Sequence, residues 1–494
     1  ARVTFVQTVA ELAHRNRNIE ALKNGGAMAL LRPLLLDNVE SIQQSAALAL
    51  GRMAAYSEEM AEALVSGEIL PQLVYSLSEH NRYYKKAAAF VIRSVARHTP
   101  QLAQAVVDSA AVEALVTCME EFDPGVKEAA AWALGYIARH SGELAQAVVD
   151  DNAVPLLVLC VQEPELSLKR IAASALSDIC KHSPELAQVV VDAEAINNLA
   201  ALITHSDAKL KRQVCSCLAQ IAKHSVELAE LVVEGEIFPK IFTLLKDPDD
   251  QVRKHAATCI REIAKHTPEL AQLIVNAGGV AALVDYVKQS KGNARLPGIM
   301  TLGYIAAFSE TLALAVIVSK GIEPISHALE VETEDHIKAA SAWSLGQIGR
   351  HSPDHAKAIA DAQVFPKLLD AYLDENSSQD LKLKSKRALK YVVQKCLHLP
   401  ALEPLLNPQT PANLLKYVIS QFAKVLPHDV QARREFVTSM CLSRLQAIDT
   451  NDNPKLAEAI RTIHNCYPEE IVKYYSPNYS HKLLEKIDTY QPNL

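Results

Sequence analysis

The sequence predicts an all-α, right-handed solenoid built from three-helix repeats of about 42 residues. A ten-residue phrase recurs along the chain, as IAKHTPELAQ at 263–272 and ICKHSPELAQ at 179–188. Its histidine returns every 42 residues at His98, His140, His182, His224 and His266, and again at His351. A fixed period of this size is typical of helical repeats that stack into one continuous core.

The recurring phrase predicts the end of one helix and the start of the next. Lys265 and His266 place positive charge at a helix C-terminus, Thr267 is the next N-cap, and Pro268 takes the first helical position. The cap column holds only Ser or Thr, at Ser57, Thr99, Ser141, Ser183, Ser225, Thr267, Ser309 and Ser352. The histidines thus have a structural explanation as exposed partners of the helix dipole, and we expect no catalytic or metal-binding role for them.

The order of elements follows from these marks. We expect residues 1–16 to form the last helix of a truncated repeat, and therefore expect residues to be missing before Ala1. Eight full repeats are expected at 17–353. In 185–226 we expect helices at 185–192 and 196–204 and a long third helix from about 206 to 224. Short, short and long is the pattern of armadillo repeats, whereas HEAT repeats have two helices.

The third helix of each repeat carries small and apolar residues on one face, which predicts close stacking of neighbours. Ala173 and Ala257 fall on this face, as do Cys215, Cys217 and Cys259. The chain has 9 cysteines, an odd number, and they are expected to be small core residues in a reducing compartment. We predict no metal site and no cofactor.

The repeats loosen after residue 353. One longer copy fills 354–400, and we place the boundary there, with the armadillo solenoid (a partial repeat and about nine further ones) at 1–400 and degenerate helical repeats at 401–494. The last segment is rich in tyrosine and predicts a terminal cap. The alternative is a docking surface or a contact between two copies in a homo-oligomer, through Tyr467, Tyr474, Tyr475 and Tyr479.

Armadillo proteins bind partners in a groove lined by their third helices. Helical spacing around Trp132 collects a face on which basic residues outnumber acids by ten to three. The basic residues are Lys86, Arg97, Arg139, Arg170, Lys181, Arg212, Lys223, Lys254, Lys265 and Arg350; the acids are Glu128, Asp178 and Glu262. Together with Trp132, Tyr136, Trp343 and Gln347, this face predicts a groove for an acidic or extended partner segment, although a solvated surface remains the alternative.

A second basic column lies on the far side of the third helix from Trp132. It comprises Lys85, Lys127, Lys169, Lys211, Arg253, Arg295 and Lys338. We expect these residues to form ties within and between repeats, with little stabilisation from each pair if it is exposed.

Composition argues against several functions. The net charge of −7 on an almost balanced chain disfavours attraction to nucleic acid or membrane surfaces. No apolar run approaches the length of a membrane span, and no signal-peptide pattern is visible. Outside the repeat columns we find no nucleophile–base pair, phosphate loop or metal-ligand cluster, so we predict that the chain is not an enzyme.

Longer stretches resemble a known family. FDPGVKEAAAW at 122–132, LSLKRIAASALSD at 166–178, GNARLPG at 292–298 and CYPEEIVKYYSP at 466–477 are similar to the armadillo-repeat proteins of the axonemal central apparatus. The resemblance implies a cytoplasmic, cytoskeletal scaffold in the axoneme of motile cilia or flagella that supports beating. Its implied partners are central-apparatus proteins and tubulin in microtubules.

An importin-like adaptor for an extended peptide cargo is the alternative function. Trp132 and Trp343 resemble the groove tryptophans of importin-alpha, whose pattern has Asn four residues later. Here those positions hold Tyr136 and Gln347, so the paired Trp–Asn array for a basic peptide is absent.

Overall fold

The computed structural model describes residues 1–78, 81–448 and 454–489, which form helices and no strands. Two compact units divide the chain, Ala1–His266 and Thr267–Leu494. The predicted all-α armadillo fold is confirmed. Among the described helices, none is by itself long and apolar enough to span a membrane, although four bent helix pairs would be by length and composition alone.

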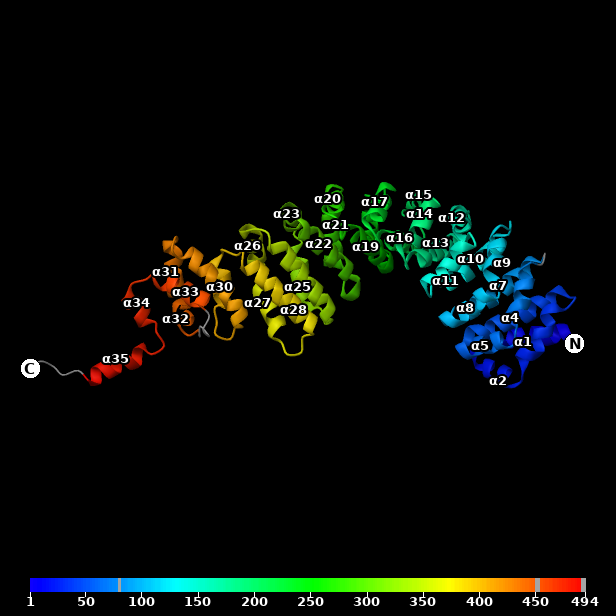
Figure 1. Ribbon diagram of the computed structural model, residues 1–494, viewed down its shortest axis with the longest axis horizontal. Helices are drawn as coiled ribbons and strands as arrows, with labels where there is room; N and C mark the ends of the chain where they lie inside the picture. Colours follow the sequence, from blue (N-terminus) through cyan, green and yellow to red (C-terminus); the bar gives the residue numbers. More distant parts are fainter. Residues whose placement is uncertain (79–80, 449–453, 490–494) are drawn as a thin grey trace, which may run out of the picture. The chain divides into compact units, whose positions relative to one another are not determined.

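The third helices form the spine of each unit, and successive ones pack side by side (Figure 1). In the first unit they are α1 (Arg2–Ala13), α4 (Glu40–Tyr56), α7 (Arg82–Ala96), α10 (Pro124–Ala138), α13 (Leu166–Cys180), α16 (Ala208–Ala222) and α19 (Asp250–Ala264). In the second unit they are α22 (Leu296–Phe308), α25 (Asp335–Gly349), α28 (Gln379–Val393), α30 (Ala412–Val425) and α33 (Pro454–His464).

Two shorter helices precede most of the third helices. The first helices are α2 (Ile19–Asn24), α5 (Glu58–Ser66), α8 (Pro100–Asp108), α11 (Gly142–Asp150), α14 (Pro184–Asp192), α17 (Val226–Glu234), α20 (Pro268–Asn276), α23 (Glu310–Val318), α26 (Pro353–Asp361) and α31 (Val430–Thr438). The second helices are α3 (Ala27–Leu31), α6 (Leu70–Leu77), α9 (Ala111–Met119), α12 (Ala153–Gln162), α15 (Ala195–Ala201), α18 (Lys240–Thr243), α21 (Gly279–Gln289), α24 (Ile322–Val331), α27 (Val364–Leu373), α29 (Leu399–Leu402) and α32 (Cys441–Gln446). Helices of the 3₁₀ type lie at Asn16–Asn18, Arg32–Leu36, Leu244–Lys246, Gly292–Ala294 and Glu403–Leu405.

The Ser/Thr cap column is confirmed at every position. Each hydroxyl accepts a hydrogen bond from the backbone N–H three residues later, as Ser183 does from Leu186 and Thr267 does from Leu270. A second column, between the first and second helices, takes left-handed φ values with unrelated side chains, such as Ala110 (59°), Asn152 (62°) and Glu194 (62°). No shared residue type in the sequence predicts this column.

Small residues let the third helices approach closely. Ala173 and Ala257 are fully buried, as are Cys215, Cys217 and Cys259. A Cβ atom added to Gly135 of α10 would lie 3.2 Å from the Cβ of Ala175 in α13, so a side chain there would push the two helices apart. The predicted buried face is therefore correct.

The histidine column acts differently from our expectation. Each ring is half-buried, and its Nε2 donates to a backbone carbonyl at the C-terminus of the preceding repeat's third helix. The acceptors lie 44 residues earlier: Ala54 for His98, Ala96 for His140, Ala138 for His182, Cys180 for His224 and Ala222 for His266. The histidines are thus hydrogen-bonding partners between repeats, because they satisfy carbonyls that the preceding helix leaves open.

Four members of the far-side basic column tie successive repeats, as predicted. Lys85 pairs with Glu121, Lys127 with Glu163 and Lys211 with Asp247, each 36 residues later, and Arg295 pairs with Glu332 at 3.1 Å. Three of these bases are buried rather than exposed, with 8% of Lys85, 9% of Lys211 and 4% of Arg295 accessible. Removing one partner of such a buried pair therefore costs more unfolding free energy than removing one partner of an exposed pair.

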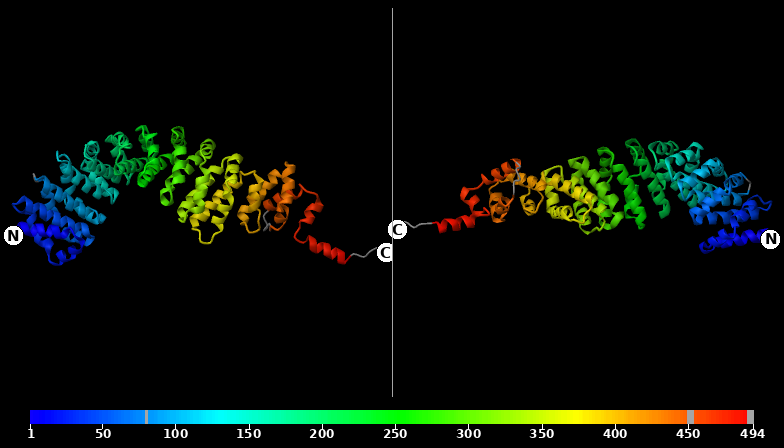
Figure 2. Two further views of the ribbon diagram at one scale, coloured as in Figure 1. Left: turned by 180° about the vertical axis from the view of Figure 1, so that it is seen from behind. Right: turned by 60° about the horizontal axis from the view of Figure 1, so that its bottom comes forward.

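The C-terminal part of the second unit continues the repeat in degenerate form. Helices α31, α32 and α33 follow the order first, second, third, and Met440 takes the left-handed position with a φ of 61°. Beyond them, α34 (Glu469–Tyr474) and α35 (Tyr479–Asp488) bury no side chains, and α35 lies away from the packed helices of this unit in every view (Figure 2). The domain boundary at residue 400 stays a prediction.

Candidate functional site

A pocket of about 360 Å³ opens on the third-helix face of the first unit, where the sequence predicts the groove. Helices α10, α13 and α16 line it with Trp132, Tyr136, Arg139, Arg170, Ser174, Asp178, Lys209 and Arg212, among others. Four of the proposed groove residues, spread over 80 residues of sequence, therefore share one cavity with Trp132. An armadillo stack creates such a cavity because its third helices lie side by side.

Trp132 is 39% exposed, but one face of its ring already has a cationic partner. The guanidinium of Arg93 on α7 lies 3.8 Å from the ring centroid. Arg139 lies 5.1 Å from the ring of Tyr136 in the same manner. A basic peptide that stacked on this face of Trp132 would have to displace Arg93, which adds to the missing Asn in weakening the importin-like alternative.

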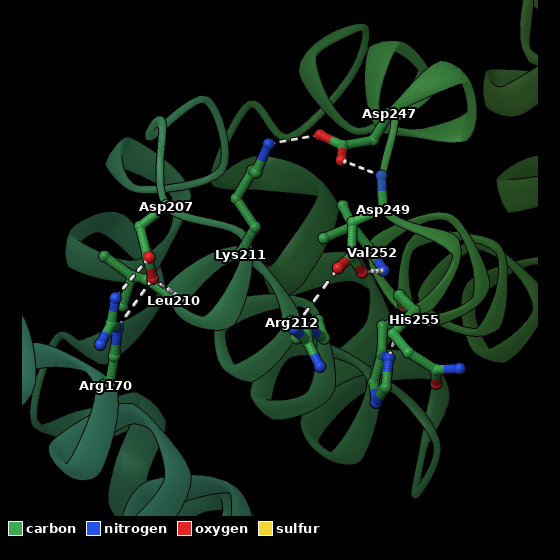
Figure 3. A network of polar contacts seen from close by, with 10 residues as sticks. Arg170, Asp207, Leu210, Lys211, Arg212, Asp247, Asp249, Val252 and His255 are labelled. Carbon is green, nitrogen blue, oxygen red and sulfur yellow. Dashed lines mark hydrogen bonds and ion pairs between the residues drawn. The ribbon is translucent and has the colours of Figure 1, made fainter.

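Two arginines of the pocket are neutralised by the caps of the following third helices (Figure 3). Arg170 donates to both carboxylate oxygens of Asp207, with Nε at 2.8 Å, and Arg212 pairs with Asp249 at 3.4 Å. Each aspartate also caps its own helix by accepting from the N–H of Leu210 or Val252. The hydrogen bond from Arg170 lowers the pKa of Asp207 to about 2.

Three of the remaining basic residues of the predicted groove also find partners. Lys181 pairs with Asp178 at 2.8 Å, Lys265 pairs with Glu262, and Lys223 donates to the carbonyl oxygen of Lys181 at 2.6 Å. Lys254 forms no ion pair with any described residue of the chain. The positive excess counted from the sequence is therefore only partly balanced within the groove.

The predicted residues of the second unit gather around a separate cavity. Trp343 and Gln347 of α25, with Arg350 directly after this helix, line a pocket of about 160 Å³ together with residues of α28. Trp343 packs edge-on against Tyr304 at 5.0 Å between ring centroids, and Arg350 donates to the carbonyl oxygen of Ala307 at 2.7 Å. This second cavity repeats the Trp–Gly–Arg order of the first.

The contacts of Arg93, Asp207 and Asp249 in the groove were not predicted from the sequence. Asp207 and Asp249 lie 37 residues after the arginines they bind, so a search for opposite charges at that spacing would have found both. Arg93 falls outside the helical positions chosen for the groove face.

The tyrosine-rich end separates into two parts. Tyr467 is half-buried, donates from its hydroxyl to the carbonyl oxygen of Arg433 at 3.1 Å and stacks on Phe436, and burial raises its pKa. Tyr474, Tyr475 and Tyr479 form a cluster with ring centroids 5.0 and 5.3 Å apart, in which Tyr474 is 58% exposed. Of these four tyrosines only Tyr474 is exposed, so its cluster is the more accessible surface for docking.

No group of three or more metal-binding side chains comes together among residues 1–78, 81–448 and 454–489. The thiols of Cys180, Cys215 and Cys259 are fully buried, and burial raises their pKa values, which disfavours the reactive thiolate form. The groove pocket offers charge and an aromatic wall rather than a nucleophile with a base.

Comparison with known proteins agrees with this architecture. A family model for the armadillo/beta-catenin-like repeat matches residues 99–139 and 143–181, and one for the HEAT repeat matches 237–267. An engineered protein of known crystal structure aligns with a TM-score of 0.72 at 23% identity, covering 89% of this chain and 98% of its own, which supports the fold. Sperm-associated antigen 6 of Homo sapiens is 64% identical over 168 residues, 34% of this chain and 33% of its own length.

The mouse relative extends the similarity to the whole chain. Sperm-associated antigen 6 of Mus musculus is 68% identical over 492 residues, which cover 100% of this chain and 97% of the relative. Identity at this level over almost the full length of both sequences goes well beyond what a shared repeat explains. The chain therefore belongs to the sperm-associated antigen 6 family of armadillo-repeat proteins.

Proposed function

We propose that the chain is a non-catalytic scaffold of the central-pair microtubule apparatus in the axoneme of motile cilia and flagella. It binds central-apparatus proteins or tubulin through its armadillo surface and so supports motility. The observation that carries the proposal is the 68% identity with mouse sperm-associated antigen 6 over the full chain, because that name associates the relative with a flagellated cell.

The groove of the first unit is the proposed partner site. Its pocket of about 360 Å³ is large enough for side chains of an extended segment, and Trp132 and Tyr136 supply aromatic surface. Arg170 and Arg212 are held in place by Asp207 and Asp249, so they are preorganised rather than free. Arg139, Lys209 and Lys254 form no ion pair among the described residues and supply the charge for an acidic partner.

Fractionation of axonemes tests the location. A tagged copy of the chain, expressed in cells that build motile cilia, is expected to remain with the central-pair microtubules after detergent removes the membrane and soluble matrix. Recovery of the chain with soluble cargo instead of the axoneme would overturn the proposal and favour an adaptor.

Paired variants test the site. Lys209→Glu with Lys254→Glu should weaken binding to axonemal microtubules, and rising salt should weaken it further because it screens exposed charges. Tyr474→Ala with Tyr475→Ala serves as the comparison. If the tyrosine changes abolish binding while the charge reversals leave it intact, the tyrosine-rich end is the docking surface. Tight, Trp132-dependent binding of a Lys/Arg-rich peptide would instead support the importin-like alternative.

A further inference from the structure

The second unit contains a cationic site that lacks the acids found in the first. Lys384 and Arg387 of α28 and Arg350, the C-cap of α25, line the cavity of about 160 Å³ beside Trp343, Gln347 and Tyr391. None of the cavity's lining residues is acidic. No ion pair to any of the three cations occurs among the described residues, and the polar contact of Arg350 is to the Ala307 carbonyl.

The cap of the following third helix also adds no negative charge. In the first unit, Asp207 and Asp249 cap the next third helix and bind Arg170 and Arg212. The third helix after α28 is α30, whose N-cap is Pro411, a residue without a carboxylate. The position that supplies the neutralising charge elsewhere is therefore empty of charge here.

Charge is concentrated on α28 as a whole. Its fifteen residues include five cations, Lys382, Lys384, Lys386, Arg387 and Lys390, against one acid, Asp380, in a chain whose net charge is −7. Lys386 and Lys390 lie over the rings of Tyr372 and Tyr417 at 5.9 and 5.8 Å, on the other side of the helix from the cavity. Lys384 and Arg387 are left to face a ligand.

A buried amide points to a peptide as that ligand. Gln347 lines the same cavity, is only 7% exposed and makes no side-chain hydrogen bond to any described residue. Its amide can form hydrogen bonds with the backbone of an extended peptide, and the guanidinium groups of the two arginines can bind carboxylates with two hydrogen bonds each. Trp343 and Tyr391 offer apolar surface to the methylene groups of Glu.

We propose that this cluster, which we call the α25–α28 site, binds an acidic, Glu/Asp-rich peptide segment of a partner. The proposal names a partner class for the scaffold and so rests on the proposed function. A short acidic segment responds to the local patch, whereas a long polyanion would also be repelled by the acidic chain around it.

Binding of labelled peptides to the full chain tests this proposal. Fluorescence anisotropy at 150 mM salt should detect a ten-residue Glu/Gly peptide and not its Lys/Gly counterpart. Lys384→Glu with Arg387→Glu should weaken binding at least tenfold. The matched control, Lys386→Glu with Lys390→Glu, makes the same change of net charge on the opposite side of α28 and should weaken it less than threefold.

Three results would overturn the proposal. These are no binding of the Glu peptide, equal losses in the two double variants, or tighter binding of a ten-nucleotide oligothymidylate through Lys384 and Arg387.

Because Trp132 and Trp343 are the only two tryptophans, Trp132→Phe leaves Trp343 as the reporter, and its emission should change with the peptide. Gln347→Leu changes no charge and should weaken binding severalfold. It therefore tests the site even if the charge-reversed variants misfold. Peptide binding without axonemal recovery would disprove only the proposed function, and the converse would disprove only this site.

Discussion

His182 donates from Nε2 to the carbonyl oxygen of Ala138 at 2.7 Å, across the junction between two repeats. Because the bond is half-buried, His182→Ala should leave that carbonyl without a partner and cost about 1–3 kcal/mol of unfolding free energy. This is at least as much as the loss of the neighbouring cap in Ser183→Ala, about 1 kcal/mol. Urea denaturation measures both. A smaller loss for His182 than for Ser183 would return the histidine to the exposed role that the sequence suggested.

The histidine column also predicts a pH dependence. Burial lowers the pKa of His140, His182, His224 and His351 below 6.5. The unfolded chain therefore takes up protons at a higher pH than the folded chain, so stability is full above about pH 6.5 and falls as the pH drops through that value. The urea midpoint should decrease from pH 7.5 to 5.5. His182→Gln should make the decrease smaller, and a midpoint that rises toward pH 5.5 would contradict the assignment.

The buried tie between Lys211 and Asp247 should be costly to break from one side. Lys211→Met leaves the Asp247 carboxylate without its cation and should cost about 3–5 kcal/mol, part of which Asp247→Leu in the same chain should restore. Lys169→Met is the matched control, because the position 36 residues after Lys169 is His205 and no acid. Its effect on the unfolding free energy should stay within about 0.5 kcal/mol. Equal effects of the two Lys→Met changes would show that the tie is not stabilising.

The fully buried alanines of the third helices should not tolerate larger side chains. Ala173→Leu and Ala257→Leu should each overpack a helix junction and cost about 1–3 kcal/mol. Ala201→Leu, on an exposed position at the end of α15, is the control. Thermal unfolding of the three variants separates these outcomes, and unchanged midpoints for Ala173 and Ala257 would mean that the wrong face is assigned to the core.

The left-handed column offers a route to higher stability. Glu194 has a φ of 62°, which is strained for a residue with a Cβ atom, so Glu194→Gly should gain about 1 kcal/mol. Gly278, at the same point of a later repeat with a φ of 78°, should lose a similar amount when changed to Ala. Urea denaturation checks both signs, and a loss for Glu194→Gly would show that its side chain outweighs the strain.

Local features of each repeat could be predicted from the sequence. The caps at Ser183 and Thr267 and the buried face through Ala173 follow from residue type and helical spacing within a few positions. Helix ends were predicted within a few residues, since α16 is Ala208–Ala222 where 206–224 was expected. These signals are local because capping and amphipathic packing need only one helix.

Pairing between repeats could not be predicted in the same way. From the sequence, Arg170 counted as excess positive charge. Its contact with Asp207 depends on how far one third helix is displaced along the next, and the pattern within one helix does not give that displacement. The left-handed position escaped notice for a different reason. Ala110, Asn152 and Glu194 share a backbone conformation but no side-chain chemistry, so no pattern of residue types marks them.

The reach of the ties determines how such a chain can change in length. Each histidine bond and each far-side ion pair reaches one neighbouring repeat, and the single extra residue before His351 only lengthens its bond from 44 to 45 positions. Duplication or loss of one whole repeat would leave donor and acceptor matched at the new junction. A deletion of half a repeat would leave a histidine, a lysine and an aspartate without their partners at the same junction. We therefore expect chains of this family to have gained or lost complete repeats during evolution.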